Sequence, residues 1–464
     1  MDVIQKTILL LGKIVWGPHM LILILGVGLF LTLRLRFVQL RRFGLSIRLL
    51  FGGKDYGEST TDRRGDISPF QALTTSLAAV IGNGNIAGVC TAIAMGGPGA
   101  VFWMWLSAFF GMATKVVEAV LGQRFKRTMS DGAVVGGPMY YIKEGLKLPW
   151  LAGIFAFFMG CKPLFSTTSI QSNSIALALK TQLGLEPWIS GLGLAVLTWL
   201  VIIGGIKSIA KVTEFLSPIM VFLYLFGALL TIILFASKLP HALSLIFVGA
   251  FKPQAITGGV AGATVARAIR YGFSRGAYSN EAGTGTAAVF HATARTSEPV
   301  RQGLIASLDV FVDTLLICSL TALSVLVTGA WTEGTSTGMT AAAFNAALPK
   351  IGGLIVVASS FLFGYSSLIA VPYYGEISFS YLLGVWIKKP FRWIFCLVIF
   401  IGAVLEVEVA WSIGDVFNGM MAFTNLIGII GLSGMAVGAV KTYLQRIDMN
   451  KNRIKPQAEL GEKK

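Results

Sequence analysis

The chain has 464 residues, of which 55% are hydrophobic and 13% are charged. An ordinary soluble domain carries about 25% charged residues, so this composition excludes a disordered chain, a fibrous protein and a typical cytosolic enzyme. At about 20 residues per span, the chain is long enough for ten or more membrane-spanning helices. We therefore expect a multi-pass membrane protein.

Hydrophobic runs separated by polar breaks predict eleven membrane-spanning segments. Several of these runs are too long or too rich in glycine to be simple straight helices. The predicted spans lie near residues 14–33, 70–95, 99–122, 150–180, 188–205, 212–236, 254–290, 303–328, 351–383, 391–410 and 412–440.

The basic residues are concentrated on one side of these spans. If the N-terminus lies outside and the C-terminus inside, most of the 38 Lys and Arg residues fall in inside segments, above all in 34–64, 124–147 and 441–464. Cytoplasmic loops of membrane proteins carry such an excess. The formal net charge of +16 therefore indicates topology and contact with anionic lipid, and not nucleic-acid binding. We expect a bacterial plasma membrane with a cytoplasmic C-terminus.

An odd number of spans suggests one extra helix and a core of ten. Ten helices can divide into two five-helix halves of opposite orientation, as in one large class of secondary transporters. The sequence thus predicts an all-α membrane protein with an N-terminal helix and basic loop (1–69), an inverted-repeat core (70–440) and a basic tail (441–464). The two halves are expected at about 70–236 and 254–440.

The first core span contains Gly82-Asn83-Gly84 at mid-membrane depth. Glycine relaxes a helix and lets a ligand approach the backbone, and unwound backbone is tolerated in a bilayer only where it is buried in protein or lines a cavity. The freed N–H groups can hold a carboxylate and the freed carbonyls a cation. Close packing of small residues between helices is the alternative.

The second half contains a corresponding glycine-rich stretch at 257–264, which we interpret as its partner break. The same alternative of small-residue packing applies to it. A polar, glycine-rich stretch follows at 275–286. It lacks the lysine of a phosphate-binding P-loop, so ATP-driven transport is not expected.

The cysteines and histidines of the chain do not indicate an enzyme. No nucleophile–base set or metal cluster can be assembled from neighbouring positions, so neither an enzyme nor a resident cofactor is expected. The few candidate residues are far apart in the chain: Cys90, Cys161, Cys318, Cys396, His19, His241 and His291.

Six motifs in order along the chain resemble the sodium:alanine (alanine or glycine:cation) symporter family. The resemblance implies the inverted-repeat fold of the leucine-transporter type and sodium-driven import of an amino acid. The motifs are 82–88 (GNGNIAG), 96–105 (GGPGAVFWMW), 136–142 (GGPMYYI), 275–285 (RGAYSNEAGTG), 299–304 (PVRQGL) and 373–376 (YYGE).

The resemblance also implies positions for a binding site. Substrate would contact the first break, a polar pair in the fourth span, and residues of the seventh and ninth spans. Sodium would be held by hydroxyl and carbonyl oxygens, which suit a hard cation. The implied substrate residues are Gly82, Asn83, Gly84, Asn85, Gln171, Asn173, Gly259, Val260 and Val371. The implied sodium residues are Ala78, Ile81, Ser366 and Ser367.

Four positions depart from the family pattern. The family usually has threonine at Asn83, an aromatic residue at Val260 and a tryptophan at Val371, and it lacks Pro372. Because valines stand in place of two large aromatic rings, the substrate pocket should be larger than is usual in the family. We therefore expect a neutral amino acid larger than alanine.

Lys162 is a further departure, because it lies within a predicted span where a small residue is expected. Lysine at mid-membrane is costly and is a functional candidate by default. It could take the place of the sodium ion and make transport proton-linked or ion-independent, or it could hold an acidic substrate. A buried, paired or snorkelling lysine is the structural alternative.

Other charges also fall within spans. Lys115 and Glu118 are spaced to pair on one helix face. Asp309 and Asp313, four residues apart, need partners, for which Arg267, Arg270 and Arg301 are candidates; a proton relay is the other interpretation. Glu281 and Glu376 could act in gating or bind helix ends.

The sequence thus favours a secondary amino-acid carrier that works by alternating access, with sodium as co-substrate and no cofactor. A proton-coupled or sodium-independent carrier that uses Lys162 is the main alternative. An ion channel would need a pore-lining repeat in an oligomer, whereas both breaks lie within one chain. The sequence predicts neither the amino acid nor the oligomeric state.

Overall fold

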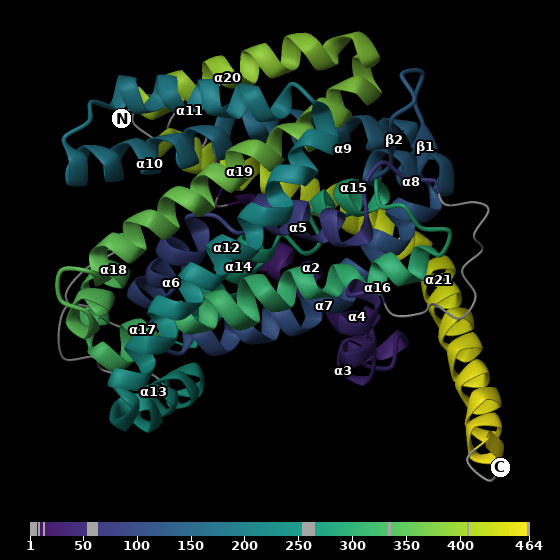
Figure 1. Cartoon of the computed structure of the whole chain (residues 1–464), viewed down its shortest axis with the longest axis horizontal. Helices are drawn as coiled ribbons and strands as arrows, with labels where there is room; N and C mark the ends of the chain where they lie inside the picture. The colour runs from purple at the N-terminus through teal and green to yellow at the C-terminus, as the bar shows by residue number, and fades with distance from the viewer. Residues whose placement is uncertain are drawn as a thin grey trace.

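The computed structural model describes residues 7, 10–12, 14–52, 64–252, 265–332, 336–405 and 408–461. These residues form a helical bundle, and one two-stranded antiparallel sheet pairs β1 (Arg127–Thr128) with β2 (Val134–Val135). Most long helices run between the end of the bundle that carries α18 and the end that carries α8 and this hairpin (Figure 1). The predicted all-α membrane class is confirmed.

The N-terminal region and the first half follow the expected order. The N-terminal helices are α2 (Pro18–Arg34), α3 (Val38–Arg41) and α4 (Phe43–Leu50). The first half contains α5 (Pro69–Val80), the π-helical η1 (Gly84–Gly88), α6 (Val89–Gly96), α7 (Ala100–Arg124), α8 (Pro138–Gly145), α9 (Pro149–Lys162), η2 (Pro163–Thr167), α10 (Thr168–Leu183), α11 (Pro187–Ile202) and α12 (Gly205–Leu234).

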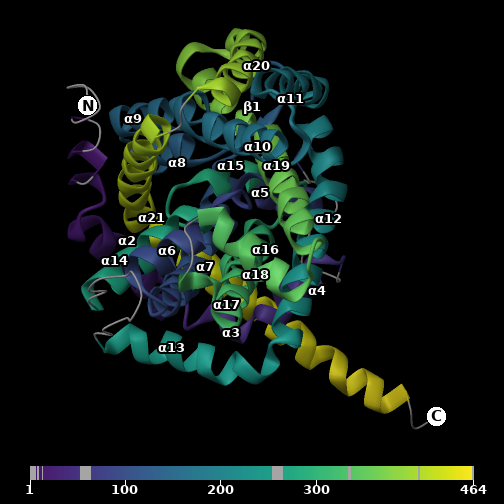
Figure 2. The ribbon, with the colours of Figure 1, turned by 90° about the vertical axis from the view of Figure 1, so that its left-hand side faces the viewer.

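The second half follows η3 (Ala236–Lys238) and α13 (Leu239–Phe251). Figure 2 shows α13 at the bottom of the bundle, on the side away from α20. The half contains α14 (Val265–Asn280), α15 (Thr286–Ala292), α16 (Pro299–Val310), η4 (Phe311–Cys318), α17 (Ser319–Thr328), η5 (Ala330–Thr332), α18 (Ser336–Ala347), α19 (Gly352–Leu383), η6 (Val385–Ile387), α20 (Lys388–Val404) and α21 (Glu408–Gly461).

Within the described residues, six helices are long and apolar enough to cross a membrane, or seven when one bent pair is counted as a span. Shorter apolar helices cover 18–34, 187–202 and 236–251. These elements are consistent with the predicted eleven spans, although the count itself stays a prediction. The helix α13 is an addition that the sequence analysis did not propose.

The first break lies where the sequence places it. Helix α5 begins at a capping box, in which the Ser68 hydroxyl accepts from the Gln71 N–H and the Gln71 side chain accepts from the Ser68 N–H. It ends at Ile81, whose backbone is extended (φ −75°, ψ 105°). The helix axis bends by 58° between 69–80 and 84–96. Two half-helices therefore meet inside the bundle.

In the second half, the described break lies further along the chain than expected. Helix α14 ends at Asn280, and α15 begins at Thr286. Between them, Glu281, Gly283 and Gly285 all have positive φ values (52°, 92° and 86°), a backbone conformation that glycine adopts freely. The stretch 257–264, which we predicted as the partner break, lies outside the described residues. The glycines of the 275–285 motif thus form the turn that separates α14 from α15.

The two halves are joined at one end of these broken helices. Ile67, which precedes α5, pairs in parallel with Ala294, which follows α15. The Gln123 side chain at the end of α7 donates to the carbonyl of Ala294 at 3.0 Å. The starting end of α5 and the final end of α15 therefore lie together, as antiparallel broken helices require.

Helix α7 also packs closely against α14. A side-chain carbon added at Gly272 would lie 2.3 Å from the carbonyl oxygen of Ala100 and 2.6 Å from Cβ of Trp103. We expect Gly272→Ala to lower the free energy of unfolding by about 1–3 kcal/mol through overpacking. Thermal denaturation of the purified protein in detergent measures this loss. Gly193→Ala is the control, because nothing lies within 4 Å of its added carbon; equal stability of the two variants would contradict the prediction.

Candidate functional site

The two helix breaks lie against one another. The Asn85 amide in the first break donates to the Ser279 hydroxyl (3.1 Å) at the end of α14 and to the Asp313 carboxylate (2.6 Å) in η4. A side-chain carbon at Gly84 would lie 3.9 Å from the Tyr278 ring. The end of α14 thus borders the predicted substrate position, and Tyr278, Ser279 and Asp313 join a site for which the sequence analysis did not name them.

The backbone N–H groups freed at the first break are satisfied by side-chain amides. The Gly82 N–H donates to Oδ1 of Asn85 at 3.0 Å, and the Asn83 N–H points to Oε1 of Gln171 at 3.4 Å. A carboxylate is a stronger acceptor for an N–H group than a neutral amide oxygen. The N–H groups of Gly82 and Asn83, predicted to bind a substrate carboxylate, therefore lie at the break. In this structure they donate to neutral amide oxygens, which a carboxylate can replace.

Asn83 is held by two helices. Its amide donates to Oε1 of Gln171 on α10 at 2.9 Å, and its oxygen accepts from the hydroxyl of Ser360 on α19. The structure does not bring Asn173 to this cluster, because its side chain donates to the carbonyl of Leu405 at 2.9 Å. Of the predicted polar pair, only Gln171 contacts the break.

Five oxygen atoms converge where α5 faces α19. The Ser366 hydroxyl lies 3.3 Å from the Ala78 carbonyl, and the Ser367 hydroxyl lies 3.3 Å from the Ile81 carbonyl. Both hydroxyls also contact the carbonyl of Phe363, at 2.9 and 3.1 Å. The structure thus brings together all four predicted sodium residues and adds Phe363. The periodicity of a helix could have indicated Phe363, since it lies three and four residues before the two serines.

The break itself makes these carbonyls available. In a continuous helix the Ala78 carbonyl would accept from the Gly82 N–H, but that N–H donates to Asn85 instead. Hydroxyl groups can rotate to present lone pairs to a cation, and Ala78, Ile81, Ser366 and Ser367 are all buried. A hard cation such as sodium would therefore find a dry shell of neutral oxygens here.

Lys162 contacts the second break in this structure. It is 2% exposed, forms an ion pair with Glu281, and places its ammonium 5.6 Å from the centre of the Tyr374 ring. The Thr286 hydroxyl donates to the other oxygen of Glu281 at 2.7 Å. Tyr374 lies seven residues after Ser367, or about 10 Å along the helix. Lys162 is thus a buried, paired lysine whose contacts lie away from the five oxygens.

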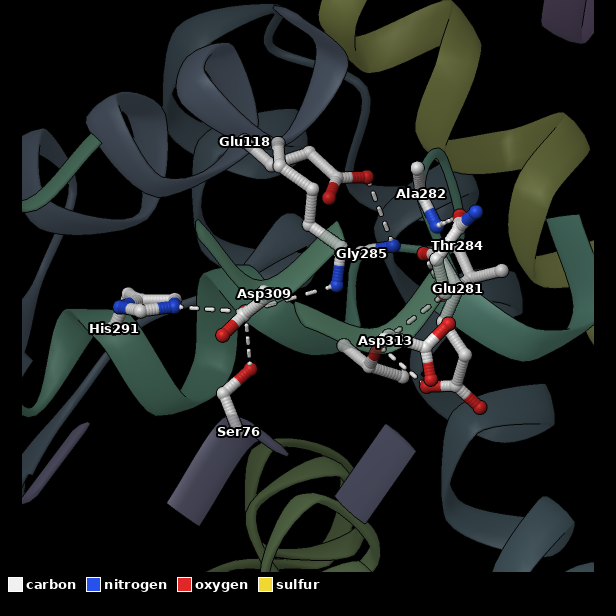
Figure 3. Close-up of polar contacts among 12 residues, drawn as sticks. Ser76, Glu118, Glu281, Ala282, Thr284, Gly285, His291, Asp309 and Asp313 are labelled. Carbon is white, nitrogen blue, oxygen red and sulfur yellow. Dashed lines mark hydrogen bonds and ion pairs between the residues drawn. The ribbon is translucent and has the colours of Figure 1, made fainter. Parts of the chain in front are cut away.

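Two further buried carboxylates, Glu118 and Asp313, lie beside the turn after α14, and a third, Asp309, lies near His291 and Ser76 (Figure 3). Glu118 accepts from the Gly285 N–H at 3.1 Å and from the Asn425 amide at 2.7 Å. Asp313 accepts from Asn85 and also from the hydroxyls of Ser279 and Thr314. Each carboxylate therefore fixes a polar atom at or beside one of the two breaks.

The third carboxylate, Asp309, receives its partners from three other helices. Its Oδ2 accepts from the Ser76 hydroxyl of α5 at 2.6 Å and lies 3.0 Å from Nε2 of His291 on α15. The Lys115 ammonium of α7 is 3.9 Å away. Lys115 and His291 were not among the predicted partners. The cluster ties the half-helices α5 and α15 to the α7–α16 pair.

Ion pairs also hold α20 against α19 and against the β1–β2 hairpin. Arg392 of α20 donates two hydrogen bonds to Glu376, at 2.6 and 2.9 Å, and Lys388 donates to Asp131 of the β1–β2 hairpin at 2.6 Å. Partial burial raises the pKa of Asp131, but the hydrogen bond and charge of Lys388 outweigh it, so that the pKa lies below its ordinary value. Glu376 thus binds a neighbouring helix, in keeping with a gating or a structural role.

The remaining predicted substrate residues lie either on α19 or outside the described residues. Val371 is buried on α19, one turn after Ser367. Gly259 and Val260 lie outside the described residues. Of the two valines predicted to widen the substrate pocket, the structure therefore describes only Val371.

Comparison with known proteins identifies relatives of this chain and a solved structure that shares its fold. The chain shares its fold with MhsT, solved in complex with L-phenylalanine (TM-score 0.55, 12% identity, 83% of this chain and 100% of the other covered). It is 42% identical to the sodium/alanine symporter AgcS of Methanococcus maripaludis over 93% of this chain and 95% of that protein. It is 35% identical to the probable sodium/glutamine symporter GlnT of Bacillus subtilis, covering 98% and 93%.

The paired broken helices belong to a fold of the leucine-transporter type, which this chain shares with MhsT. The chain is a secondary active amino-acid symporter and not an enzyme. A family model for the sodium:alanine symporter family matches residues 1–457, and the chain belongs to this family.

The pairing of Lys162 with Glu281 gives a direct test. Removing one partner of a buried ion pair costs about 3–5 kcal/mol, because the other charge is left uncompensated. We expect Lys162→Met to destabilise the protein by this amount in detergent, and the double variant Lys162→Met/Glu281→Gln to recover much of it. If instead Lys162→Met unfolds like the wild type, the lysine is not held by this pair.

Proposed function

We propose that this chain imports a neutral amino acid together with sodium. The substrate would bind between the breaks at 82–85 and 281–285, and sodium would bind at the five oxygens of α5 and α19. The convergence of Ala78, Ile81, Phe363, Ser366 and Ser367 carries the sodium part of this proposal. The names of two relatives, a sodium/alanine and a probable sodium/glutamine symporter, support it.

Coupling would follow from the position of the two sites on α5. Ala78 and Ile81 immediately precede the N–H groups of Gly82 and Asn83. A sodium ion would draw the Ala78 and Ile81 carbonyls toward α19 and so fix the break next to them. The substrate carboxylate would then replace the amide oxygens of Asn85 and Gln171. Loss of the ion would release α5 from α19 and favour the opening of that side, as alternating access requires.

The membrane setting extends this proposal. We place the chain in a bacterial plasma membrane with its N-terminus outside and its C-terminus in the cytoplasm, because most basic residues then lie inside. The buried pairing of Lys162 argues against a direct replacement of sodium by its ammonium. A proton-coupled carrier is the alternative, and the uptake experiment below distinguishes it.

Uptake by purified protein in liposomes tests the coupling ion. We expect an inward sodium gradient to drive amino-acid accumulation and a proton gradient alone to fail.

Contacts to a charged group contribute about 1.5–3 kcal/mol. Ser366→Ala or Ser367→Ala should therefore raise the sodium concentration for half-maximal uptake about tenfold to hundredfold. Ser378→Ala is the matched control, since its hydroxyl binds the Tyr374 carbonyl of the same helix.

Two results would contradict the sodium proposal. One is uptake that proceeds equally well without sodium and follows the proton gradient. The other is an unchanged sodium dependence in both serine variants while the control behaves as the wild type.

Substrate size can be tested at Val371. We expect larger neutral amino acids to compete for uptake better than alanine and glycine. Val371→Trp should fill the pocket and shift the preference toward the two smallest substrates by about tenfold, because steric discrimination in apolar pockets is of this order. Leu354→Trp is the control on the same helix, as Leu354 is 56% exposed. Alanine or glycine outcompeting every larger amino acid in the wild type would rule the size proposal out.

A further inference from the structure

A basic cavity lies where the N-terminal helix ends. After Arg34 the chain turns through Arg36 and Phe37, both with positive φ (52° and 56°), and continues as α3. Residues of this segment and of α21 face one another across a cavity of about 200 Å³. Its charged lining consists of Arg34, Arg36, Arg41, Arg42, Lys441 and Asp448.

The cations of this cavity are largely unneutralised. Asp448 is the one acidic side chain in the lining, and it is bonded to Arg42 at 2.5 Å. Arg34 contacts the Ser433 hydroxyl at 3.3 Å, and Arg41 reaches the carbonyl of Arg36 at 3.5 Å, so both contact neutral oxygens. Five cations against one carboxylate create a strongly positive concavity within the described part of the chain.

Exposed apolar side chains place this cavity at a membrane surface. Leu33, Phe37, Leu40 and Phe51 are 55%, 41%, 63% and 75% exposed, and they alternate with the basic residues along 33–51. Mixed apolar and basic helices lie in the interface plane of a bilayer. The Arg34 guanidinium lies 5.4 Å from the Phe30 ring, one turn back along α2, and such a cation–π contact accommodates a charge beside an apolar span.

From these observations we propose that the cavity binds the phosphate of an anionic phospholipid, with the acyl chains against the apolar residues of 33–51. Arginine forks match phosphate oxygens in two-point contacts, and basic pockets between membrane helices bind acidic headgroups. A free phosphate ion would use the charges but not the apolar surface. The lipid would join α2 and α3 to α21, which leaves the bundle at this point (Figure 1).

Native mass spectrometry of the full-length, delipidated protein tests this site. The protein is titrated with phosphatidylglycerol or phosphatidylcholine, and retained lipid is counted. We expect selective retention of phosphatidylglycerol by the wild type and a loss of about tenfold or more in the variant Arg36→Gln/Arg41→Gln/Lys441→Gln. The control Lys238→Gln/Lys252→Gln/Lys350→Gln removes the same charge elsewhere and should bind as the wild type.

Three outcomes would overturn the proposal. They are equal retention of phosphatidylcholine, unchanged binding by the Arg36/Arg41/Lys441 variant, and complete displacement of the lipid by excess inorganic phosphate, which would indicate a site for free anions. Should the glutamine variant fail to fold, Arg36→Lys/Arg41→Lys keeps the charge but removes the fork. Retention by this lysine variant should fall severalfold, and an undiminished value would count against arginine–phosphate recognition.

Discussion

The need to satisfy backbone polar groups inside a membrane shapes the centre of this protein. No water in the hydrocarbon region can bind an unpaired N–H or carbonyl, yet both halves contain an interrupted helix. At the first break, the side chains of Asn85 and Gln171 accept the freed N–H groups of Gly82 and Asn83. This substitution leaves the Ala78 carbonyl without its helical partner. The break therefore creates, in one step, the N–H donors that we propose for the substrate and a carbonyl that we propose as a cation ligand.

Buried charge provides the second link between the breaks and the rest of the bundle. Burial of an ion costs several kcal/mol unless partners offset it, so each such group requires a specific neighbour. In the segment α16–η4, Asp309 accepts from the Ser76 hydroxyl of α5, and Asp313 accepts from the Asn85 amide. Glu118 on α7 accepts from the Gly285 N–H. Lys162 meets Glu281. Any movement of the half-helices must rearrange these contacts.

Much of the fold could be predicted from the sequence, because a membrane imposes a simple rule on composition. A run of about 20 apolar residues spans the bilayer, and glycines on both sides of Asn83 mark an interruption at mid-membrane depth. The resemblance to the family also led us to group Ser366 and Ser367 with Ala78 and Ile81, and the structure brings these residues together. The second break was harder to place, since glycines occur both at 257–264 and at 281–285, and periodicity alone does not rank the two.

Composition, hydropathy and the glycines around Asn83 were sufficient to predict the class of protein and the position of the first break, whereas the number of spans stays a prediction. Which side chains meet depends on how the helices pack in three dimensions. Gln171 and Asn173 are two residues apart on α10, and at about 100° per residue they point to nearly opposite sides, so only one can face Asn83. Lys162 and Glu281 are separated by 119 residues. Their pairing depends on how α9 packs near the second break, because no local pattern encodes a contact between distant helices.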